Sequence, residues 1–234
     1  MLNFEHISRL KGEFEAEGLA RDILASEVIF AARNGLGYLV KIGGCEAKAD
    51  VRYLQQIGVT DIVAPMIESE FAMSKYMDAL PDGAFDHVGV TIETTNAVDR
   101  IEELLDAGTK LTEVTVGRTD LTASFGGKGV DEPATIELVK TVARAARKRG
   151  LPATMGGSVG TTTRELLGRD AELRDLIAAV ETRKCVMSVD AFMDEQALAD
   201  AFAVEKALLE MQARHHGAIA HAADARLTQI AARI

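Results

Sequence analysis

Cysteine and proline are scarce in this sequence. Its 234 residues include two cysteines and four prolines. Cys45 and Cys185 are too few for a disulfide framework, and neither has a nearby cysteine or histidine at metal-site spacing, so we expect a reducing compartment, the cytoplasm. No proline- or glycine-rich linker divides residues 11–190, which favours one domain.

Positive charge and long apolar runs are also lacking. Lys and Arg number 26 against 36 Asp and Glu, a net charge of −10, and such a surface repels nucleic acids and anionic membranes. No run reaches the roughly 18 apolar residues of a membrane span, and residues 1–11 carry Glu5, His6 and Arg9 where a secretion signal is apolar. The sequence thus predicts a soluble protein with no nucleic-acid or membrane partner.

The sequence does contain an alternation of short β-branched runs with longer segments of helical period. Repeats of about 30 residues are typical of βαβ units, and an apolar content of 47% suffices for one sizeable core. We predict an α/β fold with a single barrel over residues 1–193. The expected strands are residues 12–16, 37–42, 61–66, 87–92, 113–116, 151–155 and 181–187.

The tail, residues 194–234, is alanine-rich and helical in period. Its apolar residues, among them Leu198, Phe202 and Leu208, exceed what an isolated helix shows. We expect this C-terminal helical extension to pack on the barrel or on a neighbouring subunit, and therefore expect a homo-oligomer.

Polar residues follow the expected strands, where barrels carry their catalytic groups. Glu93 and Asp120 lie one βα unit apart, so their carboxylates are expected to converge above adjacent strands. Two such carboxylates suit Mg²⁺ or Mn²⁺, although two solvated loop acids have the same spacing.

The residues around this pair resemble a known family. The segment Thr91-Ile92-Glu93-Thr94, followed one unit later by residues 116–124 with Asp120, is similar to the paired motifs of the HpcH/HpaI aldolase and citrate lyase β-subunit family. Residues 62–69 are similar to the family's Pro-Met-Val segment. The resemblance covers residues 12–190.

The resemblance implies a (β/α)8 TIM barrel that binds pyruvate- or oxaloacetate-like 2-oxo acids through a divalent metal, Mg²⁺ or Mn²⁺. It also implies that Glu93 and Asp120 are the metal ligands. A metal chelated by the oxo acid stabilises the enolate that aldol cleavage leaves. The function expected is therefore a metal-dependent carbon–carbon lyase or its synthetic reverse.

Two positions depart from the family pattern. Lys41 stands where the family has an arginine that grips the substrate carboxylate, and lysine lacks the two-pronged hydrogen bonding of guanidinium. Residues 15–18 match the segment that carries a histidine base in the bacterial aldolases, but the histidine is missing. The base is then Glu15, Glu17 or a metal-bound hydroxide, or the protein has none.

Further residues are candidates for binding the substrate anion. Gly156 and Gly157 precede a helix, and their backbone amides either hold a carboxylate or form an ordinary turn. Arg118 follows an expected strand and Arg183 lies in the last one, and both are cationic candidates for the same role.

Two other functions stay open. Lys41 at a strand end is a candidate Schiff-base nucleophile for an aldolase that needs no metal. The missing histidine and the long tail also fit a catalytically silent barrel that binds an acidic metabolite.

The strand count falls short of a complete barrel. Seven strands are expected where a TIM barrel has eight, and the part before the tail is shorter than the roughly 250 residues typical of that fold. The resemblance places residues 12–16 on the family's second strand. We therefore expect a barrel abbreviated at its N-terminus, whose opening is closed by residues 1–10 or by a neighbour's tail.

Overall fold

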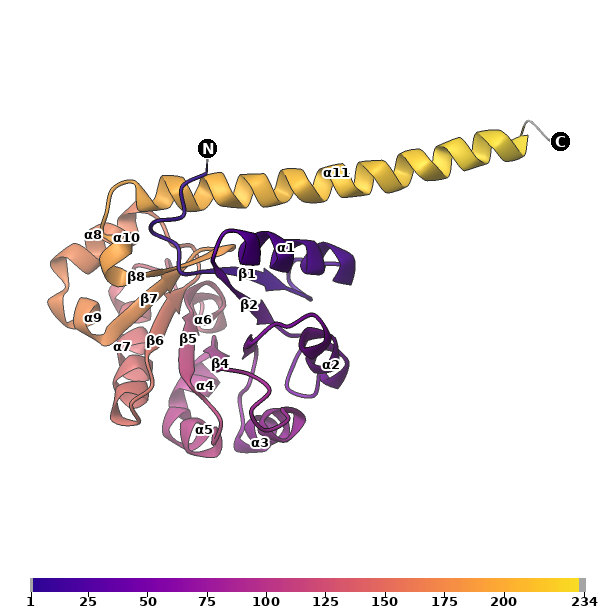
Figure 1. The fold of residues 1–234 in the computed structure, drawn as a ribbon. Coiled ribbons are helices and arrows are strands. Elements are labelled where there is room, and N and C mark those ends of the chain that lie inside the picture. Colours follow the sequence, from indigo (N-terminus) through magenta and orange to yellow (C-terminus); the bar gives the residue numbers. More distant parts are fainter. Residues whose placement is uncertain (1, 232–234) are drawn as a thin grey trace.

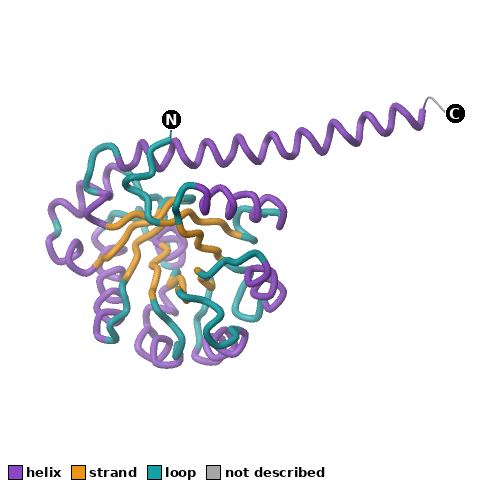
Figure 2. Tube along the Cα trace, viewed as in Figure 1, coloured by secondary structure: helices purple, strands orange, loops and turns teal. Residues whose placement is uncertain are grey.

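The structure is a computed structural model and describes residues 2–231. Its strands form a closed barrel that helices surround (Figure 1, Figure 2). The strands are β1 (Arg9–Glu13), β2 (Gly37–Lys41), β3 (Asp61–Ala64), β4 (His87–Ile92), β5 (Glu113–Gly117), β6 (Ala153–Gly156), β7 (Ile177–Glu181) and β8 (Cys185–Ser188). The helices are α1 (Arg21–Arg33), α2 (Lys48–Gln56), α3 (Glu70–Ala79), α4 (Thr95–Asp99), α5 (Ile101–Ala107), α6 (Arg118–Ser124), α7 (Pro133–Lys148), α8 (Thr161–Arg169), α9 (Ala171–Leu176), α10 (Val189–Phe192) and α11 (Ala197–Ala231).

The strand order confirms the α/β barrel but corrects the strand count. β1 to β7 run parallel in sequence order, whereas β8 is antiparallel to both β7 and β1. The single strand expected at residues 181–187 is in fact the end of β7, a turn, and most of β8. The barrel is therefore mixed, and it resembles a TIM barrel without having eight parallel strands.

The expected closure of the barrel is right only in part. β8 closes it, because Arg9 pairs with Val186 and Leu10 with Cys185. Residues 9 and 10 belong to β1 itself, which begins three residues earlier than expected. The segment of residues 1–10 thus contributes Arg9 and Leu10 to the closure, and their partner is the strand β8 of the same chain.

The main apolar core lies between the strands and the surrounding helices. A small separate cluster consists of Leu39, Val63 and Val186. Side chains alternate along a strand, so Leu39 lies between the levels of Gly37 and Lys41 on the inner face of β2. The small cluster thus forms an apolar layer beneath the polar C-terminal end.

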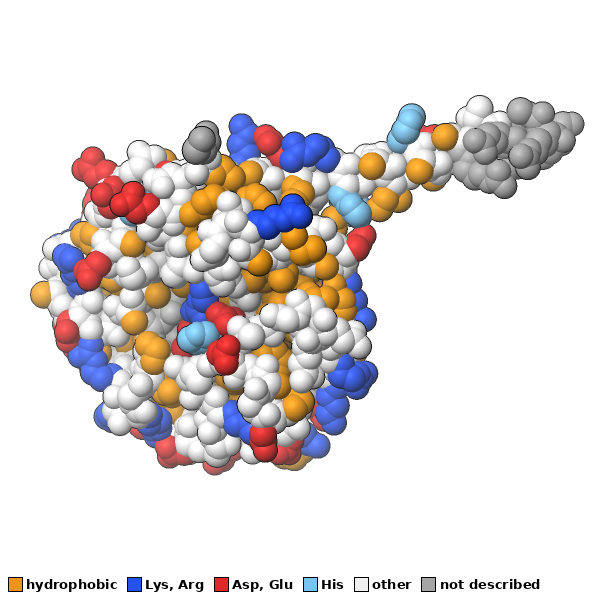
Figure 3. Space-filling model, in the orientation of Figure 1, with side chains coloured by type: hydrophobic (Ala, Val, Ile, Leu, Met, Phe, Trp, Pro, Cys, Tyr) orange, Lys and Arg blue, Asp and Glu red, His pale blue; other side chains and the backbone are white. Residues whose placement is uncertain are grey.

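Helix α11 begins against the barrel and continues past it (Figure 1). Leu198, Val204 and Leu208 near its start are buried, while Ile219 and Leu227 further along are more than half exposed. Figure 3 shows the projecting part with hydrophobic side chains among polar ones. No helix within residues 2–231 is long and apolar enough to cross a membrane.

Candidate functional site

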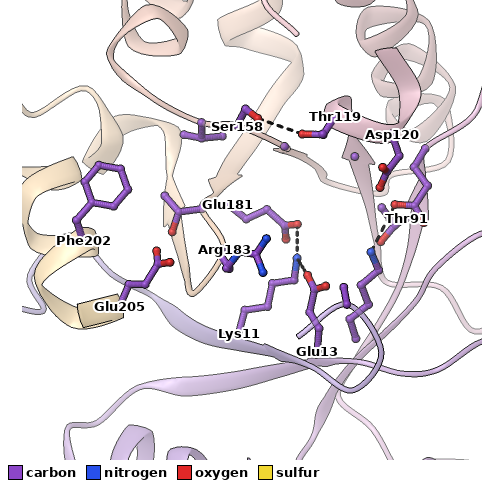
Figure 4. Close-up of a pocket in the computed structure, with 17 residues that line it drawn as sticks. Lys11, Glu13, Thr91, Thr119, Asp120, Ser158, Glu181, Arg183, Phe202 and Glu205 are labelled. Atoms are coloured by element: carbon purple, nitrogen blue, oxygen red, sulfur yellow. Dashed lines mark hydrogen bonds and ion pairs between the residues drawn. The ribbon is translucent and has the colours of Figure 1, made fainter. Parts of the chain in front are cut away.

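The C-terminal ends of the strands surround a cavity of about 560 Å³. Its wall comes from β1, β2, β4, β5 and β7, the loop after β6, the turn after β7, and α11 (Figure 4). Parallel barrels carry their chemistry at this end. The structure brings five of the sequence candidates to the wall: Lys41, Glu93, Asp120, Gly157 and Arg183.

Glu93 directly follows β4 and is only 3% exposed. Its Oε1 accepts a hydrogen bond from the Met66 backbone N–H at 3.0 Å, and its Oε2 lies 3.5 Å from Lys41 Nζ. Burial raises the pKa of Glu93 and the negative charge of Asp120 adds to this, while Lys41 and the Met66 amide act in the opposite direction. A carboxylate in this state is stabilised by an additional cation.

Asp120 lies in the first turn of α6, directly after β5. Unlike Glu93 it is exposed, yet it lines the same cavity and its charge acts on Glu93. The two carboxylates that the sequence pairs by spacing therefore lie at one site.

Two backbone positions, which sequence reasoning missed, hold Glu93 in place. Met66 has a left-handed φ of 53°, which is uncommon outside glycine and turns its N–H toward the carboxylate. At Gly117, an added Cβ would lie 3.0 Å from Glu93 Oε2, so a larger residue would crowd the carboxylate. Nothing in the sequence signals the Met66 conformation, whereas a glycine ending an expected strand signals a close approach.

A buried ion cluster occupies the middle of the cavity. Lys11 Nζ lies 2.8 Å from Glu13 Oε1 and 2.7 Å from Glu181 Oε1 (Figure 4). Burial lowers the pKa of Lys11, but the attraction of Glu181 and Glu13 outweighs it and raises the pKa overall. The pKa of Glu13 is lowered because Lys11, Lys41 and Arg183 outweigh its burial. The alternation of Arg9, Lys11 and Glu13 along one strand face is the signal that could have found this cluster.

The two glutamates proposed as bases do not line the cavity. Glu17 is turned into a buried ion pair, with its Oε2 2.6 Å from Lys184 Nζ. Burial raises the pKa of Glu17 despite this pair. Glu15 is exposed beside Gly43. The cavity presents Glu13 of the same segment instead.

Arg118 also points away from the cavity. It is fully buried, and its Nε donates to the Gly156 carbonyl at 3.0 Å and its Nη2 to the Gly157 carbonyl at 2.9 Å. Its Nη1 pairs with Asp131. These bonds tie the loop after β6 to α6, so Arg118 and Gly156 support the site without lining it, while Gly157 reaches the wall.

The loop after β6 contains two consecutive residues with left-handed backbone conformation, Gly157 and Ser158. Gly157 has a φ of 82°, and a Cβ there would lie 2.5 Å from the Thr119 backbone nitrogen. Ser158, at φ 52°, exchanges a hydrogen bond with the Thr119 hydroxyl at 3.2 Å. Strained backbone of this kind gathers at functional sites.

The oxygen donors at this site fit a hard divalent cation. Within residues 2–231 no group of three or more acidic, histidine or cysteine side chains is arranged around one point. A cation here would have Glu93 and Asp120 as its protein ligands, and Mg²⁺ commonly binds proteins through one or two carboxylates. Five carboxylates line the cavity against three cationic side chains, so added positive charge is also favoured there.

Comparisons with known proteins support the fold. The structure is similar to an HpcH/HpaI aldolase from Desulfitobacterium hafniense DCB-2, with a TM-score of 0.61 and 18% identity over 86% of this chain and 82% of the other. A HpcH/HpaI aldolase/citrate lyase family protein from Burkholderia cenocepacia J2315 gives 0.60 and 19% over 86% and 84%. The citrate synthase SbnG gives 0.59 and 12% over 87% and 84%.

No protein-family model and no curated protein matches the sequence itself. The resemblance seen in the motifs is confirmed at the level of the fold: the chain has the fold of HpcH/HpaI aldolase and citrate lyase family proteins, at identities of 17–19%.

Proposed function

We propose that this protein is a divalent-metal-dependent carbon–carbon lyase of the aldolase type, or its synthetic reverse, acting on pyruvate- or oxaloacetate-like 2-oxo acids. The observation that carries the proposal is the pair of carboxylates, Glu93 and Asp120, in a cavity at the C-terminal ends of the strands. The similarity of the fold to aldolases supports the same reaction class.

The chain's own residues have distinct tasks in this reaction. Glu93 and Asp120 would hold Mg²⁺ or Mn²⁺, and the charge of the bound ion would stabilise negative charge that develops on the oxo acid. Lys41, 16% exposed beside Glu93, attracts the substrate carboxylate as a point charge. Glu13 takes the role first assigned to Glu15 or Glu17, because it is the glutamate of that segment that lines the cavity, although its lowered pKa makes it a weak base.

The test is proton exchange at the pyruvate methyl group in D₂O, followed by NMR. We expect exchange with Mg²⁺ or Mn²⁺, loss on chelation, and a drop of at least about a hundredfold in Glu93→Gln and Asp120→Asn. Glu165→Gln and Asp99→Asn are matched controls, because both side chains are exposed on helices outside the cavity. Exchange that persists in both site variants would refute the proposal.

Borohydride trapping tests the alternative that the protein is a Schiff-base aldolase. Lys41 reaches the cavity, so borohydride reduction in the presence of pyruvate would trap an adduct on it if it were the nucleophile. We expect no adduct, because a Schiff-base mechanism gives Glu93 and Asp120 no task.

A further inference from the structure

The cavity is much larger than a three-carbon oxo acid needs. Its volume of about 560 Å³ falls within the roughly 300–1,000 Å³ of pockets that hold drug-sized ligands. Asp120 lies on one side and Phe202 and Glu205 lie on the opposite side, with Arg183 between them and the ion cluster of Lys11 (Figure 4). The part lined by Arg183 and α11 is left unused by the residues assigned to the oxo acid and the metal.

Arg183 is the feature of this part that points to an anion. Lys11 and Lys41 both form ion pairs with carboxylates in the cavity wall. Arg183, in the turn between β7 and β8, forms no hydrogen bond or ion pair with residues 2–225, and its guanidinium is exposed to the cavity. A guanidinium binds a carboxylate through two parallel hydrogen bonds.

Phe202 and Glu205 determine what fits beside Arg183. They lie three residues apart on α11, on one face of the helix. The Phe202 ring is 52% exposed and lines the cavity, so it offers an apolar surface. Glu205 makes the same end negative, which disfavours a second anion there. A ligand that carries one anionic group, which binds Arg183, and one apolar group, which packs on Phe202, fits this part of the cavity and places no second anion near Glu205.

We propose that Arg183 and Phe202 form a subsite for the second substrate, a 2-oxo acid with an apolar side chain, whose carboxylate binds Arg183 and whose side chain covers Phe202. Its role as acceptor rests on the proposed function. In that reaction the methyl carbon of the first oxo acid, having lost a proton, forms a bond to the acceptor's carbonyl carbon. The carbonyl oxygen then takes up a proton, and no atom is lost.

The test measures binding of three probes by calorimetry, without any need for turnover. Benzoylformate carries both the carboxylate and an apolar group, glyoxylate only the carboxylate, and benzaldehyde only the apolar group. We expect Arg183→Met to lower the affinity for benzoylformate and for glyoxylate by at least about tenfold, and to leave the affinity for benzaldehyde unchanged. Phe202→Ala is expected to lower the affinity for benzoylformate and for benzaldehyde several-fold, and to leave the affinity for glyoxylate unchanged.

Controls separate this subsite from general effects. Arg52→Met and Phe71→Ala remove matched side chains exposed on α2 and α3, outside the cavity, and we expect them to bind benzoylformate like the wild type. Arg183→Lys keeps the positive charge but loses the two parallel hydrogen bonds of the guanidinium, so it should bind benzoylformate with intermediate affinity. Equal benzoylformate affinity in wild type and Arg183→Met, or no binding to the wild type, overturns the proposal. Arg183-dependent binding in a protein that fails to exchange pyruvate protons supports the subsite and rejects the lyase function alone.

Discussion

Glu93 carries its charge at a position that is 3% exposed, with Lys41 Nζ at the long distance of 3.5 Å. The net result is a raised pKa, so the charged form is less stable in the folded chain than in water. Binding sites often contain groups that lower the free energy of unfolding, and the free energy of ligand binding offsets this loss. This cost can be measured.

Glu93→Gln is therefore expected to stabilise the protein at neutral pH in the presence of a chelator. An acid whose folded pKa is raised makes the folded state lose stability as pH rises from the unfolded pKa, about 4.3 for glutamate, through the folded one. Glutamine removes this loss and can still accept the Met66 hydrogen bond. The gain in melting temperature, about 2–4 °C per kcal/mol for a chain of this size, should vanish near pH 4.

Thermal unfolding followed by circular dichroism from pH 4 to pH 8 checks this expectation. Glu165→Gln, exposed on α8, is the control and should track the wild type at every pH. A Glu93→Gln variant that melts below the wild type at pH 8 would show that the ion pair with Lys41 outweighs burial.

At the scale of elements, the sequence predicts the strands that are followed by a helix. It misses the boundary between β7 and β8, where a strand is followed directly by another strand. β2 to β5 begin at the residues expected from the sequence, because each short β-branched run is followed by a segment of helical period. The turn between β7 and β8 is Thr182-Arg183-Lys184 and holds no Gly, Pro, Asn or Asp, so no residue type marks the hairpin. The same logic explains the site: strand-end acids such as Glu93 are predictable, whereas Phe202 reaches the cavity only through the packing of α11.

β8 is fixed in place by a buried ion pair network. Lys184 is 1% exposed, and its Nζ lies 2.6 Å from Glu17 Oε2 and 3.2 Å from Glu27 Oε2. Glu27, on α1, also accepts hydrogen bonds from Tyr38 and from Gln212 of α11. One buried lysine thus joins the turn before β8 to α1, and α11 bonds to the same carboxylate of Glu27.

Lys184→Met is expected to destabilise the fold by about 3–5 kcal/mol at pH 7, because two buried carboxylates lose their only cation in the network. Burial already raises the pKa of Glu17 and Lys184 opposes this, so without Lys184 that pKa rises further, stability falls as pH rises, and the deficit should be smaller at pH 5 than at pH 7. Urea unfolding at both pH values measures it. Lys206→Met, on the exposed side of α11, should change stability by less than about 0.5 kcal/mol. A deficit independent of pH would assign the loss to packing.

At the scale of the whole molecule, α11 divides into a part that the barrel uses and a part that it leaves free. Up to Leu208 the helix buries apolar side chains on the barrel, and at Gln212 and His215 it still bonds to Glu27 and Asp22 of α1. Beyond this point the helix projects, with Ile219 54% and Leu227 63% exposed (Figure 1). A free-standing apolar helix face in water favours association, and we propose that a second copy of the chain covers it.

Ending the chain after Gly217 tests this association without disturbing the barrel. The shortened protein keeps every α11 contact named above, so we expect its melting temperature at low concentration to match that of the full chain. Light scattering should show an oligomer for the full chain and fewer subunits per particle for the shortened one. The double variant Ile219→Gln, Leu227→Gln in the full chain should reproduce the smaller particle, because it removes the apolar side chains and keeps the helix. An equal number of subunits in all three proteins would show that α11 does not mediate assembly.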